Sequence, residues 1–234
     1  LIALDAAATI GEHSPHSRHA AVIAPGAARL VDEAAAKQRL AAAGISVPAG
    51  RVAEHQAVPA AAADVGYPIT LKALGLAHKS EVGAVKVGIR NGEELAIALA
   101  AMPRTTAGYL VEATVTDVVA EVLVTVRRDP PIGWLVSLGF GGVTTELWND
   151  VTHLLAPVTT DDVKAALRTL RSAPLLTGFR GRPPADVTAL AELVVRLTDA
   201  VVGSDLVEVE LNPVLVGHHG ATAVDALMIV EDLR

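Results

Sequence analysis

Short apolar segments alternate with turn-forming residues along most of the chain. Runs rich in valine, isoleucine and leucine predict strands at 67–73, 84–90, 109–114, 119–127, 134–138 and 206–211, with hairpin strands around 214–216 and 221–226. Capped segments with helical spacing predict helices at 32–43, 57–65, 93–102, 161–172 and 187–202. This interleaving favours a mixed α+β fold over an all-helical or all-strand one.

Local signals support these boundaries. Val122, Val124 and Val126 alternate with less apolar neighbours, which predicts a strand with one buried face. Asp32 and Asp186 are suited to cap the helices that follow them. Residues 11–26 mix histidine, serine, proline and glycine without a hydrophobic period. We therefore expect a linker or leader at 1–29 and two lobes, 30–111 and 112–234, which meet near Val111 and Glu112.

Composition limits the classes of function. Of the 234 residues, 51% are hydrophobic and 19% are charged, which suits a folded core rather than a disordered chain. The 19 basic and 26 acidic residues give a net charge of −7, so a nucleic-acid backbone is not the expected partner. The absence of cysteine excludes disulfides and thiolate chemistry and fits a cytoplasmic location. No apolar run approaches the ~20 residues that cross a bilayer, and no signal peptide is evident.

The first candidate site follows the strand at 67–73. Lys72 ends an apolar run, and the next residues include Gly75, His78 and Lys79. A lysine beside a glycine-bearing loop can neutralise phosphate oxygens while the loop amides donate hydrogen bonds to them. The neighbouring lysines would favour the neutral, nucleophilic form of the His78 imidazole. The alternative is an ordinary strand-end lysine followed by an ordinary loop.

The second candidate site is a pair of polar residues near the C-terminal end. If the strands that carry Asn212 and Asp225 are antiparallel neighbours, the two side chains converge as oxygen ligands. Mg²⁺ accepts one or two protein ligands when phosphates and water complete its octahedron. The alternative is a solvated hairpin in which Asn212-Pro213 forms a turn.

Taken in order, several motifs resemble one family, the ATP-grasp domain of NDP-forming acyl-CoA synthetases, which are relatives of succinyl-CoA synthetase. The resemblance covers about 200 residues and rests on the order and spacing of the motifs. They are Glu33 with Lys37, 44–48, 66–68, 71–73, 78–83, Glu121, 127–130, 139–142, 155–157, 178–184 and 208–213. Leu154 departs from the pattern, because an arginine is usual there.

The resemblance implies an ATP-grasp fold with two α+β lobes that hold ATP or ADP. It implies that Lys72, Lys79 and Glu121 bind the nucleotide and that Val111 and Glu112 form a hinge beside adenine. Asn212 and Asp225 would hold Mg²⁺. His78 matches the histidine that takes a phosphoryl group and passes it to ADP.

The reaction implied by the resemblance is acyl-CoA + ADP + phosphate = acid + CoA + ATP, catalysed by an acid–thiol ligase. This chain would supply only the nucleotide half, so CoA-binding and ligase domains are expected as partners, either fused or as a separate subunit. They would bring the acyl-CoA or carboxylate substrate, and an oligomer is expected. The alternative is a degenerate nucleotide-sensing module of a fused protein lysine acetyltransferase. A carboxylate–amine ligase is disfavoured because such an enzyme needs no histidine beside Lys79.

Overall fold

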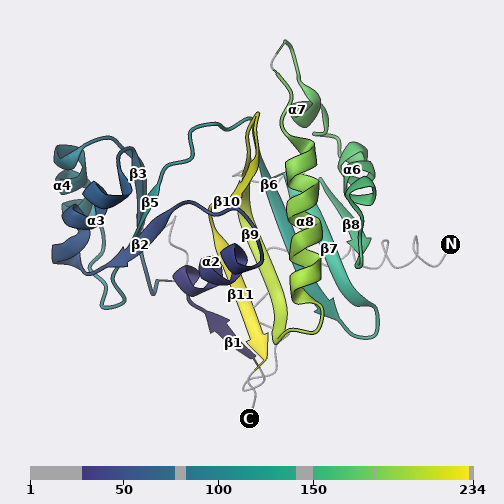
Figure 1. Cartoon of the computed structure of the whole chain (residues 1–234), viewed down its shortest axis with the longest axis horizontal. Coiled ribbons are helices and arrows are strands. Elements are labelled where there is room, and N and C mark those ends of the chain that lie inside the picture. Colours follow the sequence, from purple (N-terminus) through teal and green to yellow (C-terminus); the bar gives the residue numbers. More distant parts are fainter. Residues whose placement is uncertain (1–27, 77–82, 141–149, 182, 232–234) are drawn as a thin grey trace.

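A computed structural model describes residues 28–76, 83–140, 150–181 and 183–231, and its strands form two sheets (Figure 1). The larger sheet has the order β1-β11-β9-β6-β7-β8, with β10 paired to β9, and all the pairs are antiparallel. Its strands are β1 (Ala28–Val31), β6 (Ala120–Asp129), β7 (Gly133–Phe140), β8 (Val151–Leu155), β9 (Leu206–Val216), β10 (Ala221–Ala223) and β11 (Ala226–Glu231).

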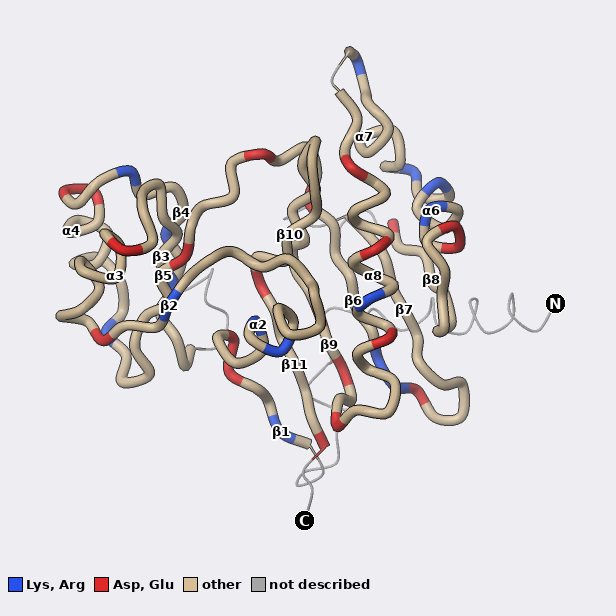
Figure 2. Tube along the Cα trace, viewed as in Figure 1, with Lys and Arg blue, Asp and Glu red and all other residues tan. Residues whose placement is uncertain are grey.

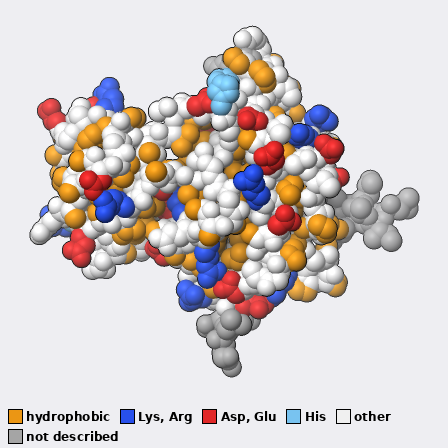
Figure 3. All heavy atoms as spheres, in the orientation of Figure 1, with side chains coloured by type: hydrophobic (Ala, Val, Ile, Leu, Met, Phe, Trp, Pro, Cys, Tyr) orange, Lys and Arg blue, Asp and Glu red, His pale blue; other side chains and the backbone are white. Residues whose placement is uncertain are grey.

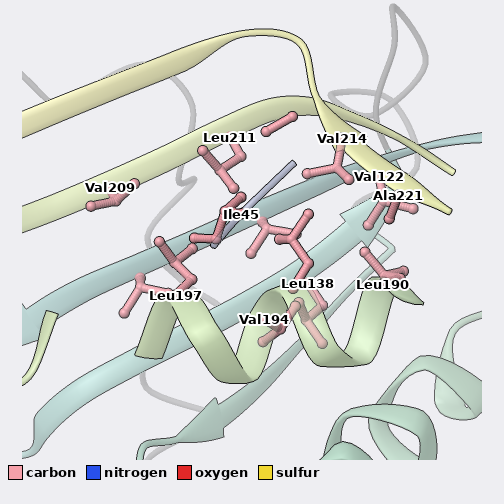
Figure 4. Close-up of a cluster of buried hydrophobic side chains, with 14 of the residues drawn as sticks. Ile45, Val122, Leu138, Leu190, Val194, Leu197, Val209, Leu211, Val214 and Ala221 are labelled. Carbon is pink, nitrogen blue, oxygen red and sulfur yellow. The ribbon is translucent and has the colours of Figure 1, made fainter. Parts of the chain in front are cut away.

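Helices cover one face of the larger sheet. They are α2 (Glu33–Ala42), α6 (Thr160–Thr169), the short α7 (Pro174–Thr177) and α8 (Val187–Val201). Leu190, Val194 and Leu197 lie at three- and four-residue spacing on α8 and pack against Val122, Val209 and other valines and leucines of the sheet (Figure 4). Burial of each such side chain stabilises the fold by roughly 1.5–3 kcal/mol.

The smaller sheet has the order β2-β5-β3-β4 and forms a separate lobe with its own core. It contains β2 (Gly50–Ala53), β3 (Ile69–Ala73), β4 (Val85–Ile89) and β5 (Tyr109–Ala113). The turn η1 (His55–Ala57) and the helices α3 (Val58–Val65) and α4 (Gly92–Ala101) pack with these strands. Tyr109, Ile69 and Leu71 are fully buried in this second core.

The predicted helices and most predicted strands are present, and the α+β class is confirmed. Asp32 and Asp186 cap α2 and α8 through their side chains, as predicted. Strands β1 and β8 were not predicted, and β9 is a single strand through Asn212-Pro213, where the sequence predicts a break. The predicted linker at 1–29 lies outside the described residues apart from its last two.

The assignment of residues to lobes also differs from the prediction. Strand β1 pairs with β11, and α2 packs against β11, so this segment belongs with the larger sheet although it precedes the smaller one in the chain. The smaller lobe is therefore inserted between α2 and β6. Because of this arrangement, α2 lies where the two sheets approach each other (Figure 1).

Charged side chains of both signs are scattered over the described part of the chain rather than separated by sign (Figure 2). Acidic and basic positions are interspersed along both lobes (Figure 2), and polar and apolar side chains alternate over the face in Figure 3. Within the described ranges, no helix is long and apolar enough to cross a membrane.

Candidate functional site

Four charged side chains and one backbone carbonyl meet where the two sheets approach each other. Glu33 and Lys37 come from α2, Lys72 comes from β3, and Glu112 comes from β5. The carbonyl belongs to Val224, between β10 and β11. We call this group the junction cluster. Its four side chains belong to residues that are at most 5% exposed, so the ion pairs are shielded from water.

Short contacts connect the junction cluster across both lobes. The Lys72 ammonium donates to Glu33 Oε1 at 2.7 Å and to the Val224 carbonyl at 2.5 Å. The Lys37 ammonium donates to Glu112 Oε1 at 2.5 Å and to the same carbonyl at 2.7 Å, and it lies 3.2 Å from Glu33 Oε1. Lys72 also lies 3.5 Å from Glu112 Oε2. Each lysine therefore contacts both glutamates.

Local structure explains why these side chains meet. Glu33 and Lys37 are four residues apart on α2, so they share a face of the helix. The register pairs Glu112 with Thr70 on one side and with Gly50 on the other. A Cβ atom at Gly50 would lie 2.6 Å from the Val111 carbonyl oxygen and 2.8 Å from Glu112 Cγ. A glycine at this position therefore leaves room for the Glu112 side chain.

The two lysines experience different electrostatic environments. Burial by itself lowers the pKa of Lys72, but the negative charges of Asp225, Glu33 and Glu112 outweigh burial and raise it. The pKa of Lys37 is lowered by burial and by the positive charge of Lys72, against the opposing effect of Glu112 and Glu33. Lys72 is therefore held firmly as a cation at the junction.

The predicted pair of oxygen ligands lies next to the junction cluster. Strands β9 and β11 are antiparallel neighbours, but Asp225 directly precedes β11 rather than lying on it. The Asn212 backbone amide donates to the Asp225 carbonyl at 3.3 Å. Asn212 Nδ2 donates to Glu210 Oε1 at 3.3 Å. Asp225 directly follows Val224, whose carbonyl binds both lysines. Carboxylate and amide oxygens are ligands that suit Mg²⁺, so this donor set fits the ion.

Removing the Asp225 carboxylate tests this assignment. We expect Asp225→Ala to abolish the dependence of nucleotide binding on Mg²⁺, because one of the two proposed protein ligands is lost. Calorimetric titration of the chain with ADP, with and without Mg²⁺, measures the effect. Asp205→Ala on the surface removes the same charge and is the control. An unchanged Mg²⁺ dependence in Asp225→Ala would favour the solvated hairpin.

The face of the larger sheet opposite α8 carries a polar row that the sequence analysis missed. The register places Glu210 opposite Thr125, Thr125 opposite Ser137, and Ser137 opposite His153. Ser137 Oγ lies 3.0 Å from His153 Nδ1. Burial and the charge of Arg127 lower the pKa of His153. The alternation of polar and apolar residues along each strand contained this signal, but the strand register did not follow from it.

The other predicted site residues have different outcomes. His78 and Lys79 lie outside the described residues. Glu121 is exposed on β6 opposite Leu215, and no contact joins it to the junction cluster in the part of the chain described. Leu154 packs against the main core from β8, so that side chain does not face the polar row.

The predicted hinge at Val111 and Glu112 needs a correction of position. Both residues lie inside β5, which pairs with β2 on one side and with β3 on the other. A strand that is hydrogen-bonded on both sides is not a point of bending. The chain passes from the smaller to the larger sheet after β5 ends at Ala113, in residues 114–119. Glu112 contributes instead to the junction cluster, where its side chain contacts Lys37 and Lys72.

The signal for Glu33 and Lys37 was present in the sequence but was not interpreted as a site. Glu33, Ala36, Lys37 and Leu40 are all buried and form one face of α2. Two opposite charges on the apolar face of an alanine-rich helix require buried partners. The sequence could not show that the partners lie on β3 and β5.

The chain has two α+β lobes, and a buried lysine of the smaller sheet lies beside the segment of the larger lobe that carries Asp225. This arrangement is typical of the ATP-grasp class. The sequence profile of the ATP-grasp domain matches residues 23–230. The chain belongs to this family, in the branch found in the beta subunits of ADP-forming acetate–CoA ligases.

Individual relatives support the same assignment. The chain is 34% identical over 215 residues to the beta subunit of ADP-forming acetate–CoA ligase I of Pyrococcus furiosus, covering 86% of this chain and 92% of that subunit. It is 37% identical over 217 residues to a trans-feruloyl-CoA synthase from an unknown prokaryotic organism, covering 86% of this chain but 31% of that protein. The chain thus spans nearly all of a beta subunit and about a third of the longer relative.

Solved structures show the same fold. Acetyl-coenzyme A synthetase 1 of Ca. Korarchaeum cryptofilum, in complex with coenzyme A and Ca-AMPCP, superposes with a TM-score of 0.81 at 31% identity, covering 86% of this chain and 93% of that one. A second structure of that enzyme contains Mg-AMPPCP and a phosphohistidine segment pointing towards the nucleotide-binding site, with a TM-score of 0.74, 31% identity and coverage of 85% and 91%. The predicted ATP-grasp fold is confirmed.

Proposed function

We propose that this chain is the nucleotide-binding part of an ADP-forming acyl-CoA synthetase and exchanges a phosphoryl group between a phosphohistidine and ADP. The overall reaction is acyl-CoA + ADP + phosphate = acid + CoA + ATP. The observation that carries the proposal is the position of Lys72, a buried cation at the junction of the two sheets, beside Asp225 and Asn212. The nucleotide complexes of the structural relatives support it.

The chemistry of the junction suits a polyphosphate. An ammonium group has three N–H donors, and Lys72 uses two of them in close hydrogen bonds to Glu33 and Val224. The third is left for a phosphate oxygen, since Glu112 Oε2 at 3.5 Å is beyond good hydrogen-bond distance. Mg²⁺, when bound, would neutralise charge on the transferred group. Asn212 and Asp225 would hold it.

The partners follow from the lengths of the relatives. The Pyrococcus furiosus relative is a separate beta subunit, whereas the trans-feruloyl-CoA synthase is a longer protein of which the chain matches a part. We propose that CoA-binding and ligase domains accompany this chain in one of these two ways and bring the phosphohistidine to it. The relatives described above are ligases or synthetases, which gives no support to a protein lysine acetyltransferase.

Binding and turnover together test the proposal. We expect the chain to bind ADP and ATP in the presence of Mg²⁺. We expect ATP to form from acyl-CoA, ADP and phosphate only when the chain is mixed with its partner domains. Calorimetry measures the binding, and a luciferase assay measures the ATP. A chain that binds neither nucleotide would contradict the proposal.

A further inference from the structure

The charges of the junction cluster balance only because Lys37 is present. Glu33 and Glu112 contribute two negative charges, and Lys37 and Lys72 contribute two positive ones, so the four side chains sum to zero. Asp225 adds a further negative charge that Lys72 experiences. Without Lys37 the four-residue sum becomes −1. Lys72 would then be the one lysine of the cluster beside the two buried glutamates.

The contacts divide the two lysines into different roles. Each lysine makes two hydrogen bonds and one longer ion-pair contact. Lys37 donates to Glu112 at 2.5 Å and to the Val224 carbonyl at 2.7 Å, and it lies 3.2 Å from Glu33. Lys72 donates to Glu33 at 2.7 Å and to the same carbonyl at 2.5 Å, and it lies 3.5 Å from Glu112. Lys72 in addition experiences the charge of Asp225, the candidate metal ligand, so Lys72 is the lysine on the side of the proposed nucleotide site.

We infer that Lys37 is a positioning residue that neutralises Glu33 and Glu112, so that Lys72 presents its positive charge to the nucleotide phosphates. The inference rests on the proposed function and adds to it a residue that touches no substrate. Glu33 and the Val224 carbonyl fix the place of the Lys72 ammonium, and Lys37 contacts the same two acceptors from α2. The helix of the larger lobe thereby sets the electrostatic field around a lysine of the smaller lobe.

This role makes a prediction that a purely structural role does not. In Lys37→Met the uncompensated negative charge repels a ligand in proportion to the ligand's own charge. At an effective dielectric constant of about 20, one charge acting over about 8 Å changes affinity by roughly 30-fold for each unit of ligand charge. We expect a loss of at least that order for ATP, smaller losses for ADP and then AMP, and a change within about twofold for adenosine.

The experiment measures the binding of adenosine, AMP, ADP and ATP to the full chain by calorimetry in EDTA. Lys37→Met and the charge-balanced Lys37→Met/Glu112→Gln are compared with the wild type. Lys164→Met on α6 removes one positive charge on the helix-covered side of the larger sheet, outside the junction cluster, and is the matched control. We expect the double variant to recover most of the affinity for ATP and the control to bind like the wild type.

Three results would overturn the inference. In the first, Lys37→Met weakens the binding of adenosine as much as the binding of ATP. In the second, the double variant binds ATP as weakly as Lys37→Met does. In the third, Lys37→Met binds all four ligands with wild-type affinity. If Lys37→Met does not fold, Glu112→Gln provides the test with the opposite sign. This substitution leaves the four side chains with a summed charge of +1, so it should raise the affinity for ATP relative to the affinity for adenosine. A ratio of the two affinities that is unchanged or lower would contradict the inference. A wild-type chain that binds none of the ligands, even with Mg²⁺ in place of EDTA, would instead refute the proposed function.

Discussion

Lys72→Met is expected to weaken the binding of ADP and ATP by at least about 100-fold. The substitution keeps most of the volume of the side chain and removes the cation that lies between Glu33 and the Val224 carbonyl. Two buried glutamates then share Lys37 as their one remaining lysine partner in the cluster, and breaking a buried pair in this way costs about 3–5 kcal/mol of stability. The predicted loss of binding thus has an electrostatic part and a stability part. Calorimetry and thermal unfolding measure the two separately.

A matched set of variants separates the two parts. Lys86 lies on β4, opposite Leu71 on β3. The variant Lys86→Met is the control and is expected to bind nucleotide like the wild type. Lys72→Met/Glu33→Gln removes one charge of each sign and is expected to recover most of the stability but little of the binding, because the group that contacts phosphate is still missing. If this double variant binds ADP normally, Lys72 does not contact the nucleotide.

The two lysines are expected to respond differently when a second substitution restores the charge balance of the cluster. Restoring charge balance is expected to rescue a variant of Lys37 but not a variant of Lys72. A buried ion cluster is by itself weak evidence for stability, because desolvation offsets most of the Coulomb attraction. What this cluster does provide is a fixed geometry, since a single carbonyl, that of Val224, binds both ammonium groups. The cluster therefore ties α2, both sheets and the candidate metal ligands to a common point.

Much of the fold could be predicted because local signals agreed with the final packing. The caps Asp32 and Asp186, the valine alternation in β6 and the spacing of α8 each determine an element from nearby residues alone. Strands β1 and β8 carry no such signal. Each is short, and each is a strand because a partner, β11 or β7, lies beside it.

The candidate site, like the fold, could be predicted only where its residues are close in the sequence. The proximity of Asn212 and Asp225 could be predicted because Asn212 lies on β9 and Asp225 directly precedes β11, which pairs with β9. The junction cluster could not, since a contact within it, that of Lys37 with Val224, joins residues 187 positions apart in the sequence. The hinge expected at Val111 and Glu112 fell within the predicted strand 109–114, and the sequence did not show that β2 and β3 would pair with this strand on its two sides.

The second large effect is expected on phosphoryl transfer, when His78 is substituted. Lys72 lies one residue before the end of β3, and the chain from Leu76 to Gly83 joins β3 to β4. The base of this connection is fixed by the hydrogen bond from the Ala73 amide to the Ala84 carbonyl at 2.8 Å. His78 itself lies outside the described residues. In the sequence, the proposed phosphoryl acceptor follows the proposed phosphate ligand Lys72 by six residues.

His78→Ala is expected to abolish phosphoryl transfer, lowering the rate by at least about 10³-fold, because loss of a nucleophile is not compensated by the groups that remain. With partner domains, acyl-CoA and labelled phosphate, the wild-type chain should acquire an acid-labile label, which ADP then removes as a P–N bond breaks and a P–O bond forms. His219→Ala, exposed in the turn between β9 and β10, is the control and should be labelled normally. The affinity of His78→Ala for ADP should remain close to that of the wild type, which separates the relay from nucleotide binding. Full turnover by His78→Ala would show that the phosphoryl group reaches ADP without this histidine.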